Sequence, residues 1–207
     1  MKKKILFCTL IVLLTLTLSG FSGCQISETV TLAPSQDGRV FSVYPDNAAD
    51  YATFFASQAW TWSGEPGIVR SLIQFNLDSI PKDAIITDAF LYLYHNPDTK
   101  HSTLSNSNAS YIERVMSSWD ASTACWNNQP VTTSINRVYL EESHSDTQDY
   151  IVDVLALVKD MRAQGNFGMM LKLASEKHYA SLFFASSNHP NSAYHPKLVV
   201  TYSHFPF

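Results

Sequence analysis

The chain has 207 residues, 45% of them hydrophobic, with 14 basic and 18 acidic residues and a net charge of −4. This length is enough for one domain with a sizeable core. The acidic balance argues against nucleic acid and against an anionic membrane surface as partners.

The first 23 residues are typical of a lipoprotein signal peptide. Three lysines at positions 2–4 precede an apolar run over residues 5–18, and small residues then lead to Cys24. The run is shorter than the ~20 residues that span a bilayer, and small residues before a cysteine suit the peptidase that cuts once the thiol carries a lipid. We therefore expect Cys24 to be lipidated and to anchor the protein at the cell envelope, facing outside the cytoplasm at the outer membrane or cell surface.

Two alternatives remain for this N-terminus. Phe21 stands where a lipobox usually has Leu, so cleavage elsewhere would give a freely secreted protein, and an uncleaved segment would act as a membrane anchor. Loss of residues 1–23 leaves 184 residues, with 11 basic side chains in place of 14 against 18 acidic ones, and a net charge near −7. We expect a short tether over residues 24–28 and one domain over residues 29–203.

Cysteine usage excludes an intrachain disulfide in the mature chain. Cys8 leaves with the signal peptide and Cys24 is the lipidated residue, so Cys125 has no partner. A lone cysteine is a candidate nucleophile, but Cys125 lies in an apolar stretch beside Trp126. A buried, structural role is therefore the better interpretation.

After Glu28, nearly every apolar segment repeats with a period of two, which is typical of strands with one buried face. The alternating residues are Val30 and Leu32, then Val69, Ile73, Phe75 and Leu77, then Met169, Leu171 and Leu173, then Leu182 and Phe184, and finally Leu198, Val200 and Tyr202. Many short strands separated by turn residues predict an all-β, two-sheet β-sandwich, because two half-apolar sheets bury their faces against each other.

One segment has helical spacing instead. Asp153 is a candidate N-cap and Gly165 a candidate stop, which predicts one short helix over residues 153–164. The apolar residues at helical spacing are Val154, Leu157, Val158 and Met161. The polar stretch over residues 96–110 is interpreted as a long surface loop.

No metal or cofactor motif appears in the sequence. The seven histidines are scattered without metal-ligand spacing, although His189 and His195 fall in one predicted loop and a shared ion is an alternative. Five aspartates would in principle supply a glycosidic acid and base or a structural calcium site: Asp37, Asp46, Asp50, Asp120 and Asp153. Several of them are interpreted first as turn formers, so we expect no cofactor, with a structural calcium ion left open.

Trp60 and Trp62 are the candidate binding residues. They lie two apart, so both indoles leave the same face of a strand, next to a predicted turn over residues 63–67. Paired indoles beside a loop can stack on sugar rings while nearby polar groups bond to hydroxyls. The alternative is that at least one of them packs in the core.

Several strings together resemble the DNRLRE domain, also classed as carbohydrate-binding module family 96, the alginate-binding type. They are Thr-Leu-Ala-Pro at 31–34 with Asp-Gly at 37–38, residues 70–81 from Arg70 to Pro81, residues 89–94, Ser-Trp-Asp-Ala-Ser-Thr at 118–123, Trp-Asn-Asn-Gln-Pro at 126–130, Asn-Phe-Gly at 166–168, and Pro-Lys-Leu-Val-Val-Thr-Tyr at 196–202. The resemblance runs from about Thr29 to Tyr202, nearly the whole mature chain.

The resemblance implies a jelly-roll sandwich, found in surface proteins or beside polysaccharide-degrading enzymes, with sugar binding in some members. It also implies that Trp126 fills the sandwich and that residues 127–130 form its exit turn. The chain departs from the family at residues 46–59, which lack the usual Asn-x-Gly turn, and at Asn76, which replaces an Asp. Alginate fits this chain poorly because a polyuronate needs a basic groove and the domain is acidic.

The sequence therefore favours a non-catalytic polysaccharide-binding protein, with a cell-surface glycan and the membrane as its partners. The alternative is a structural or adhesive surface protein without sugar specificity. A lyase or hydrolase on the same sandwich would need an acid/base constellation that the sequence does not contain.

Overall fold

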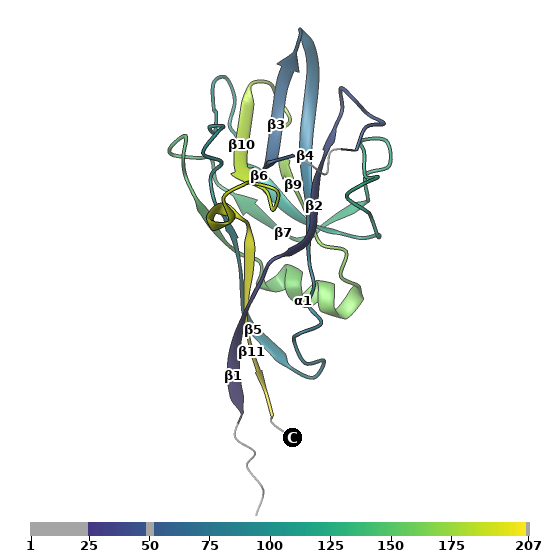
Figure 1. The fold of residues 1–207 in the computed structure, drawn as a ribbon, viewed down its shortest axis with the longest axis vertical. Coiled ribbons are helices and arrows are strands. Elements are labelled where there is room, and N and C mark those ends of the chain that lie inside the picture. The colour runs from purple at the N-terminus through teal and green to yellow at the C-terminus, as the bar shows by residue number, and fades with distance from the viewer. Residues whose placement is uncertain (1–24, 49–51, 206–207) are drawn as a thin grey trace, which may run out of the picture.

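The computed structural model describes residues 25–48 and 52–205. This part of the chain contains eleven strands, one α-helix and one 3₁₀ turn, and Figure 1 shows their arrangement. Their bounds are β1 (Ile26–Leu32), β2 (Pro34–Phe41), β3 (Phe54–Trp62), β4 (Glu65–Phe75), β5 (Ile85–Leu93), β6 (Ser110–Val115), β7 (Thr132–Leu140), β8 (Tyr150–Asp153), α1 (Leu155–Gln164), β9 (Met169–Leu173), β10 (Ala180–Ala185), η1 (Ser192–Tyr194) and β11 (Lys197–His204).

The strands form two sheets, and within each sheet every pair of neighbouring strands is antiparallel. One sheet has the order β1-β11-β5-β8 and the other the order β10-β3-β4-β9-β6-β7, with β2 paired to β4 as its seventh strand. The expected two-sheet β-sandwich with one short helix is confirmed.

The main core lies between the two sheets and is built from the alternating residues. Ile73 and Phe75 of β4 meet Leu91 of β5 and Leu198 of β11 in one continuous buried cluster. Each strand contributes every second side chain because successive side chains point to opposite faces of a sheet.

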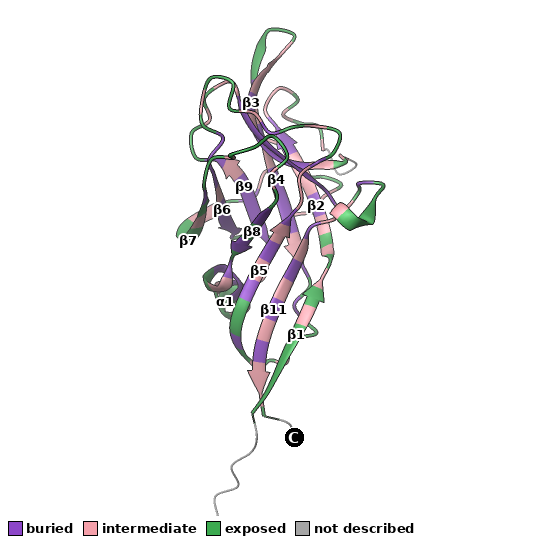
Figure 2. Cartoon of the chain, turned by 90° about the vertical axis from the view of Figure 1, so that its left-hand side faces the viewer, coloured by how far each residue is buried: buried purple, intermediate pink, exposed green. Residues whose placement is uncertain are grey.

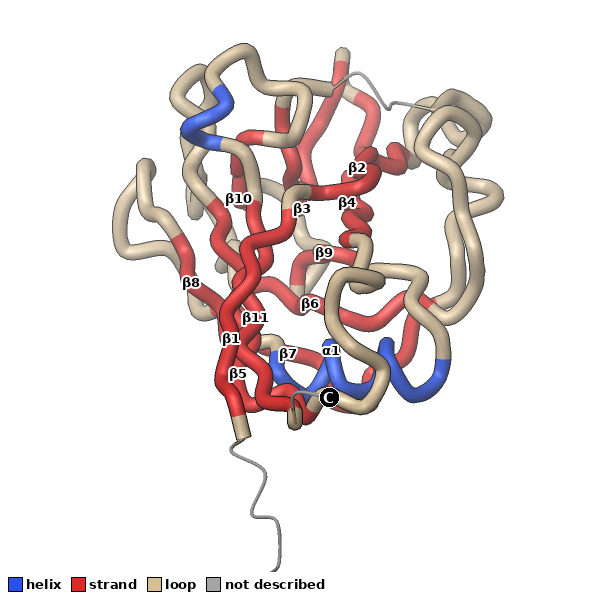
Figure 3. The backbone as a smooth tube through the Cα atoms, turned by 60° about the horizontal axis from the view of Figure 1, so that its bottom comes forward, coloured by secondary structure: helices blue, strands red, loops and turns tan. Residues whose placement is uncertain are grey.

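Helix α1 closes one end of the sandwich, beside β5, β6 and β7 (Figure 3). The apolar residues at helical spacing are all buried: Val154, Leu157, Val158 and Met161. Asp153 acts near the start, where its carboxylate accepts a hydrogen bond from the Leu155 N–H at 2.9 Å. At the other end Gly165 takes a φ of +113° and its N–H bonds to the Met161 carbonyl. The positive φ at Gly165 therefore ends the helix, and the chain continues into β9.

A smaller buried cluster lies on the opposite side of the seven-stranded sheet, under residues 116–131. It contains Val40, Leu72, Val115, Ala124 and Met170, with Trp119, Trp126 and Phe167 packed against it. The expectation that Trp126 fills the sandwich is therefore wrong: Trp126 is only partly buried and lies outside the space between the sheets. Cys125, next to it, is a buried free thiol.

Asp37 also departs from expectation. It lies within β2 rather than in a turn and is only 5% exposed. Its carboxylate accepts hydrogen bonds from the Ser187 N–H and hydroxyl, both at 2.7 Å. Burial raises the pKa of Asp37 despite these bonds. The carboxylate therefore joins β2 to the loop that follows β10.

The N-terminal strand begins close to the lipidation candidate. Cys24 lies outside the described residues, and β1 starts at Ile26, so residues 26–28 belong to the sheet and not to a tether. No helix among residues 25–48 and 52–205 has the length and apolar character needed to cross a membrane.

Candidate functional site

Trp60 and Trp62 lie on one face of β3, as their spacing predicts. Both are partly buried, and neither belongs to a core cluster of the described residues. Their cross-strand partners on β4 are Gly67 and Glu65, which lie opposite them without an intervening bulge. The indoles are therefore held at the sheet surface, between full burial and full exposure.

Aromatic residues from other segments extend this pair at both ends. The Trp60 ring meets Tyr179 edge-on, with centroids 4.9 Å apart. The Trp62 ring meets Phe41 with centroids 4.4 Å apart, and Phe41 meets Tyr44 at 5.5 Å. We call these five residues the aromatic row. Edge-to-face packing fixes the ring orientations, so little side-chain entropy would be lost when a ligand stacks on them.

The sequence gives no local signal for three of the five residues. Phe41 and Tyr44 come from the end of β2 and the turn after it, and Tyr179 precedes β10. They meet Trp60 and Trp62 only because β2 and β10 lie close to β3 across the sheet, an arrangement set by strand pairing. Tyr44 is the most exposed of these three, at 56% of its surface.

Arg39 brings a positive charge toward one end of the row. Its guanidinium carbon lies 4.6 Å from the ring centroid of Phe54 and 5.9 Å from that of Phe41. Burial lowers the pKa of Arg39, and its Nε is buried without a hydrogen-bond partner in the described structure. Because arginine stays protonated in proteins and Phe41 is only 6% exposed, this end of the row offers a partly buried cation and no free ring face at Phe41.

A second cation–aromatic pair lies on the outer side of the seven-stranded sheet. The Arg70 guanidinium sits 4.6 Å from the Trp126 ring centroid. It also donates two hydrogen bonds to the Glu176 carboxylate, at 2.7 and 2.9 Å, and one to Gln129 at 2.9 Å. The guanidinium covers the Trp126 ring and its charge is already paired, so this group stabilises the fold and offers no free stacking face.

The candidate acid–base residues do not come together. Among the described aspartates, Asp37 bonds to Ser187, Asp46 to Asn127, and Asp120 to Ser122 in its own turn. Asp153 accepts a hydrogen bond from the Leu155 N–H at the start of α1, whose N-cap residue is Val154, and Asp50 lies outside the described residues. In the described part of the chain, no three His, Cys, Asp or Glu side chains cluster closely enough to hold a metal ion.

The loop histidines His189 and His195 contact each other through a ring nitrogen and a backbone carbonyl. His189 is only 6% exposed, and its carbonyl lies 2.7 Å from the His195 Nε2. Its own Nε2 lies 3.6 Å from the Asp98 carboxylate. These contacts pack the loop, and they join the His195 ring to a backbone carbonyl and not to a second imidazole.

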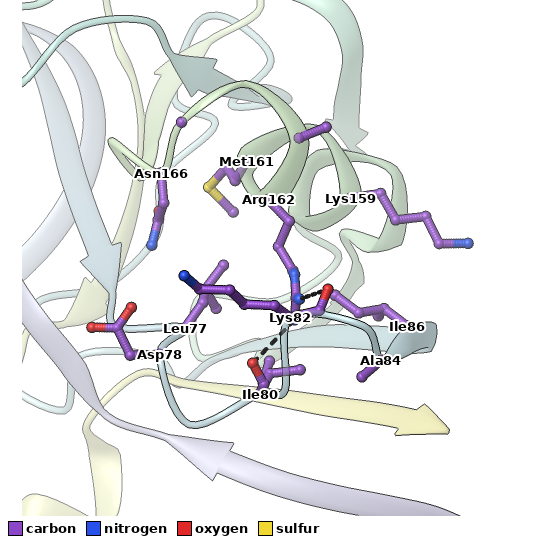
Figure 4. A pocket seen from close by; sticks show the side chains of 12 residues that line it. Leu77, Asp78, Ile80, Lys82, Ala84, Ile86, Lys159, Met161, Arg162 and Asn166 are labelled. Carbon is purple, nitrogen blue, oxygen red and sulfur yellow. Dashed lines mark hydrogen bonds between the residues drawn. The ribbon is translucent and has the colours of Figure 1, made fainter. Parts of the chain in front are cut away.

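A hollow of about 900 Å³ lies between α1 and the loop that joins β4 to β5 (Figure 4). Its apolar lining includes Leu77, Ile80 and Met161, all buried, while Asp78 and Lys82 lie at its edge (Figure 4). No aromatic residue lines it.

Arg162 holds the loop side of this hollow in place. Its guanidinium donates hydrogen bonds to the carbonyls of Pro81, at 2.8 Å, and Lys82, at 3.0 Å. The guanidinium thereby tethers the loop to the helix instead of pointing a free charge into the hollow. The hollow therefore lacks the ring faces that the aromatic row provides for stacking.

Comparison with protein families gives one match. The profile of carbohydrate-binding module family 96 matches residues 28–202, which includes every strand from β2 to β10 and nearly all of β1 and β11. No curated protein matches the chain.

Proposed function

Because the chain belongs to carbohydrate-binding module family 96, we propose that it is a non-catalytic polysaccharide-binding protein of the cell envelope, with the aromatic row as its binding surface. The carrying observation is that Trp60 and Trp62 lie side by side at a sheet surface and are oriented by Tyr179 and Phe41. Sugars present C–H groups on one face of the ring, and these groups pack against aromatic faces.

The absence of catalysis in this proposal has a chemical basis. Glycosidic cleavage by the usual mechanism needs two carboxyl groups about 5–10 Å apart on either side of the scissile bond. The described aspartates that the sequence offered for this role are each engaged with a different partner, Asp37 with Ser187 and Asp46 with Asn127 among them. A binding surface needs no such pair, and the family is one of binding modules.

The proposed anchor is a lipid on Cys24, followed almost at once by the sandwich. Only Gln25 separates Cys24 from β1. Since a residue of extended chain spans at most about 3.6 Å, the domain would be held close to the membrane surface. The protein would then keep polysaccharide next to the envelope instead of releasing it into the medium.

The test of the binding site is calorimetric titration of the wild type and of Trp60→Ala and Trp62→Ala. The ligands are alginate, polygalacturonate and neutral galactomannan. We expect one of these polysaccharides to bind, and each substitution to weaken binding by about tenfold, since loss of a stacking ring removes roughly 1–1.5 kcal/mol. Tyr139→Ala, which removes an exposed ring from β7, serves as the matched control.

Thermal melts of the same variants separate binding from folding. A ring that faces solvent can be lost with little change in melting temperature, whereas a core ring lowers the melting temperature first. Failure of the wild type to bind any of the three polysaccharides would favour a structural or adhesive surface protein. An affinity that neither substitution lowers, in folded protein, would place the binding surface elsewhere.

The anchor is tested separately by detergent phase partition of wild type and Cys24→Ala. We expect the wild type in the detergent phase and the variant in the aqueous phase, because the variant cannot accept the lipid. Equal partition of the two proteins would refute lipidation and leave the glycan-binding proposal untouched.

A further inference from the structure

A second set of aromatic side chains lies on the outer face of the four-stranded sheet. On β5, Ala89 and Leu91 are fully buried, while Phe90 and Tyr92 between and after them point the other way and are partly exposed. Tyr94, just beyond the strand, continues this alternation. We call Phe90, Tyr92 and Tyr94 the β5 stripe.

A lysine on the neighbouring strand lies over this stripe. Lys197 of β11 pairs with Tyr92, and its ammonium lies 4.9 Å from the ring centroid of Tyr92 and 5.5 Å from that of Tyr94. A side-chain hydrogen bond with Tyr94 raises the pKa of Lys197. Within residues 25–48 and 52–205, Lys197 forms no salt bridge. The rings therefore position a cation that no carboxylate neutralises.

A small hollow adjoins the Tyr94 end of the stripe. It has a volume of about 410 Å³, and its lining includes Tyr94, Lys197, Thr31, Ser192 and His195. Hydroxyl groups, an imidazole and an ammonium thus surround a space open to solvent. Such groups both donate and accept hydrogen bonds, as a ligand rich in hydroxyl groups requires.

We propose that the β5 stripe, Lys197 and this hollow form a second saccharide-binding surface, distinct from the aromatic row. Sugar rings would stack along Tyr92 and Tyr94, and hydroxyl or carboxylate oxygens of the sugar would accept hydrogen bonds from the Lys197 ammonium. The inference takes its ligand class from the proposed function, but its residues are independent of Trp60 and Trp62.

Hydroxyl groups on the β1 side of this face fit a glycan, while Ile151 of β8, which pairs with Tyr92, adds an exposed apolar side chain on the other side. Along β1, the outward residues Thr29 and Thr31 are both exposed, and the Thr29 hydroxyl bonds to that of Thr201 on β11 at 2.9 Å. Rings on β5 thus lie in the same sheet as a strip of hydroxyls. Protein interfaces concentrate apolar bulk at their centre, whereas sugar sites alternate ring faces with polar groups.

Two surfaces on one chain would make the protein bivalent. The stripe belongs to the four-stranded sheet and the aromatic row to the seven-stranded sheet, and Figure 2 shows β5, β11 and β1 side by side with β3 at the upper end. A long polysaccharide, or two chains, would engage both surfaces and bind more tightly than an oligosaccharide that fills only one. The protein would then cross-link glycan as well as hold it.

The experiment compares four proteins: the full-length wild type, a Trp60→Ala/Trp62→Ala variant, a Tyr92→Ala/Lys197→Gln variant, and the combination of all four substitutions. Each is titrated calorimetrically with alginate, polygalacturonate and galactomannan, and with short oligosaccharides prepared from them. Lys197→Gln alone is included because it alters a surface side chain and should fold if Tyr92→Ala does not. Tyr139→Ala is again the control for loss of a tyrosine ring.

We expect each double variant to keep residual binding, at about a tenth of the wild-type affinity for the polymer, and the combined variant to lose binding entirely. Oligosaccharides should titrate two sites per chain in the wild type and one in each double variant. If the tryptophan variant loses all binding and the Tyr92 and Lys197 substitutions change nothing, the second surface is refuted and the proposed site stands.

The experiment also recognises the case in which the proposed site at Trp60 and Trp62 is wrong and the second surface is right. If the tryptophan substitutions have no effect and Tyr92→Ala/Lys197→Gln abolishes binding, the stripe is a binding surface and the proposed site is wrong. Absence of binding by the wild type to all probes overturns both proposals. A change in oligomeric state of the Tyr92 variant in sedimentation, with glycan affinity unchanged, assigns this face to protein contact and refutes the inference.

Discussion

Trp62 lies directly over the backbone of Gly67. A Cβ atom at position 67 would come within 2.7 Å of the Trp62 Cε3 and Cζ3 atoms and within 2.5 Å of the Val43 Cγ2. Gly67 is also the cross-strand partner of Trp60. The missing side chain therefore lets the Trp62 indole pack against the backbone of the β3–β4 hairpin.

Gly67→Ala should weaken polysaccharide binding without removing a single aromatic group. The added methyl group must push the Trp62 ring away, because both contacts are shorter than carbon atoms tolerate. We expect a drop in affinity of about tenfold, equivalent to roughly 1.4 kcal/mol, and an overpacking cost of about 1–3 kcal/mol in the free energy of unfolding. Calorimetric titration and denaturant unfolding would measure the two effects.

Gly38→Ala is the matched control for this substitution. A Cβ at Gly38 in β2 would meet Ala121 at 3.7 Å, an ordinary van der Waals contact, and its three nearest atoms all belong to Ala121. Its affinity should equal that of the wild type. If Gly67→Ala also binds like wild type, Trp62 does not contact the glycan.

Gly168 is a position where only glycine fits. Its φ is +82°, and a Cβ there would overlap the carbonyl oxygen of Ile73 on β4. The carbonyl cannot move freely because it belongs to a strand that β9 and β2 hold on either side. We expect Gly168→Ala to lower the free energy of unfolding by more than about 2 kcal/mol, as seen by chemical denaturation, and Gly38→Ala to change it far less.

The pairing of Arg70 with Trp126 makes a further prediction. Arg70→Lys keeps the charge but loses the two-pronged contact with Glu176 and the planar stacking on the indole. We expect a loss of about 1–2 kcal/mol in the free energy of unfolding, because both partners are largely shielded from solvent.

A double-mutant cycle with Trp126→Leu isolates the stacking part of this loss. The two substitutions should be non-additive by about 0.5–1 kcal/mol, since residues in direct contact share an interaction energy. Lys100→Gln, which removes one half of an exposed ion pair with Asp146, should leave the free energy of unfolding unchanged. Additive effects of the Arg70 and Trp126 substitutions would mean that the ring and the guanidinium do not stabilise each other.

The sequence predicts the inner face of most strands but not the second buried layer. Alternation places Ile73 and Leu171 in the core between the sheets because each strand must bury one face. Leu72 and Met170 point the other way and are also buried, since residues 116–131 fold back over the outer side of the sheet. A loop that covers a sheet leaves no periodic signal, and the family resemblance, which implied that Trp126 fills the sandwich, did not identify this layer either.

The candidate site is predictable only in part for a related reason. The shared face of Trp60 and Trp62 follows from strand geometry alone. Their neighbours Phe41 and Tyr179 are set by the pairing of β2, β3 and β10, which joins residues far apart in the chain. The alternation of Phe90, Tyr92 and Tyr94 is visible in the sequence, so the β5 stripe is predictable. The contact of Lys197 with Tyr92 is not, because it depends on the pairing of β11 with β5.

His101 predicts how stability depends on pH. The ring is only 5% exposed; its Nδ1 accepts a hydrogen bond from the Phe183 N–H at 2.9 Å, and its Nε2 lies 2.8 Å from the Gln148 carbonyl. This pattern requires the neutral ring, because a protonated Nδ1 cannot accept. Burial lowers the pKa of His101, opposed by the bond to Gln148, while nearby His95 lowers it further and Asp146 and Asp149 raise it.

A histidine whose pKa is lower in the folded state binds protons more readily when unfolded. Protonation of the unfolded chain below about pH 6.5 therefore destabilises the fold, and the loss grows until the pH reaches the folded-state pKa of His101. The contribution of His101 to the free energy of unfolding should be constant from pH 8 to about pH 7. It should decrease as the pH falls below about 7. Urea unfolding at a series of pH values between 8 and 5 would measure the slope.

His101→Gln should flatten this slope, because glutamine does not titrate, although it should be less stable than wild type at pH 8 through loss of the ring's packing against Phe184. His144→Gln removes an exposed imidazole and should keep the wild-type slope. If His101→Gln and wild type lose stability in parallel as the pH falls from 7 to 5, the slope comes from other groups.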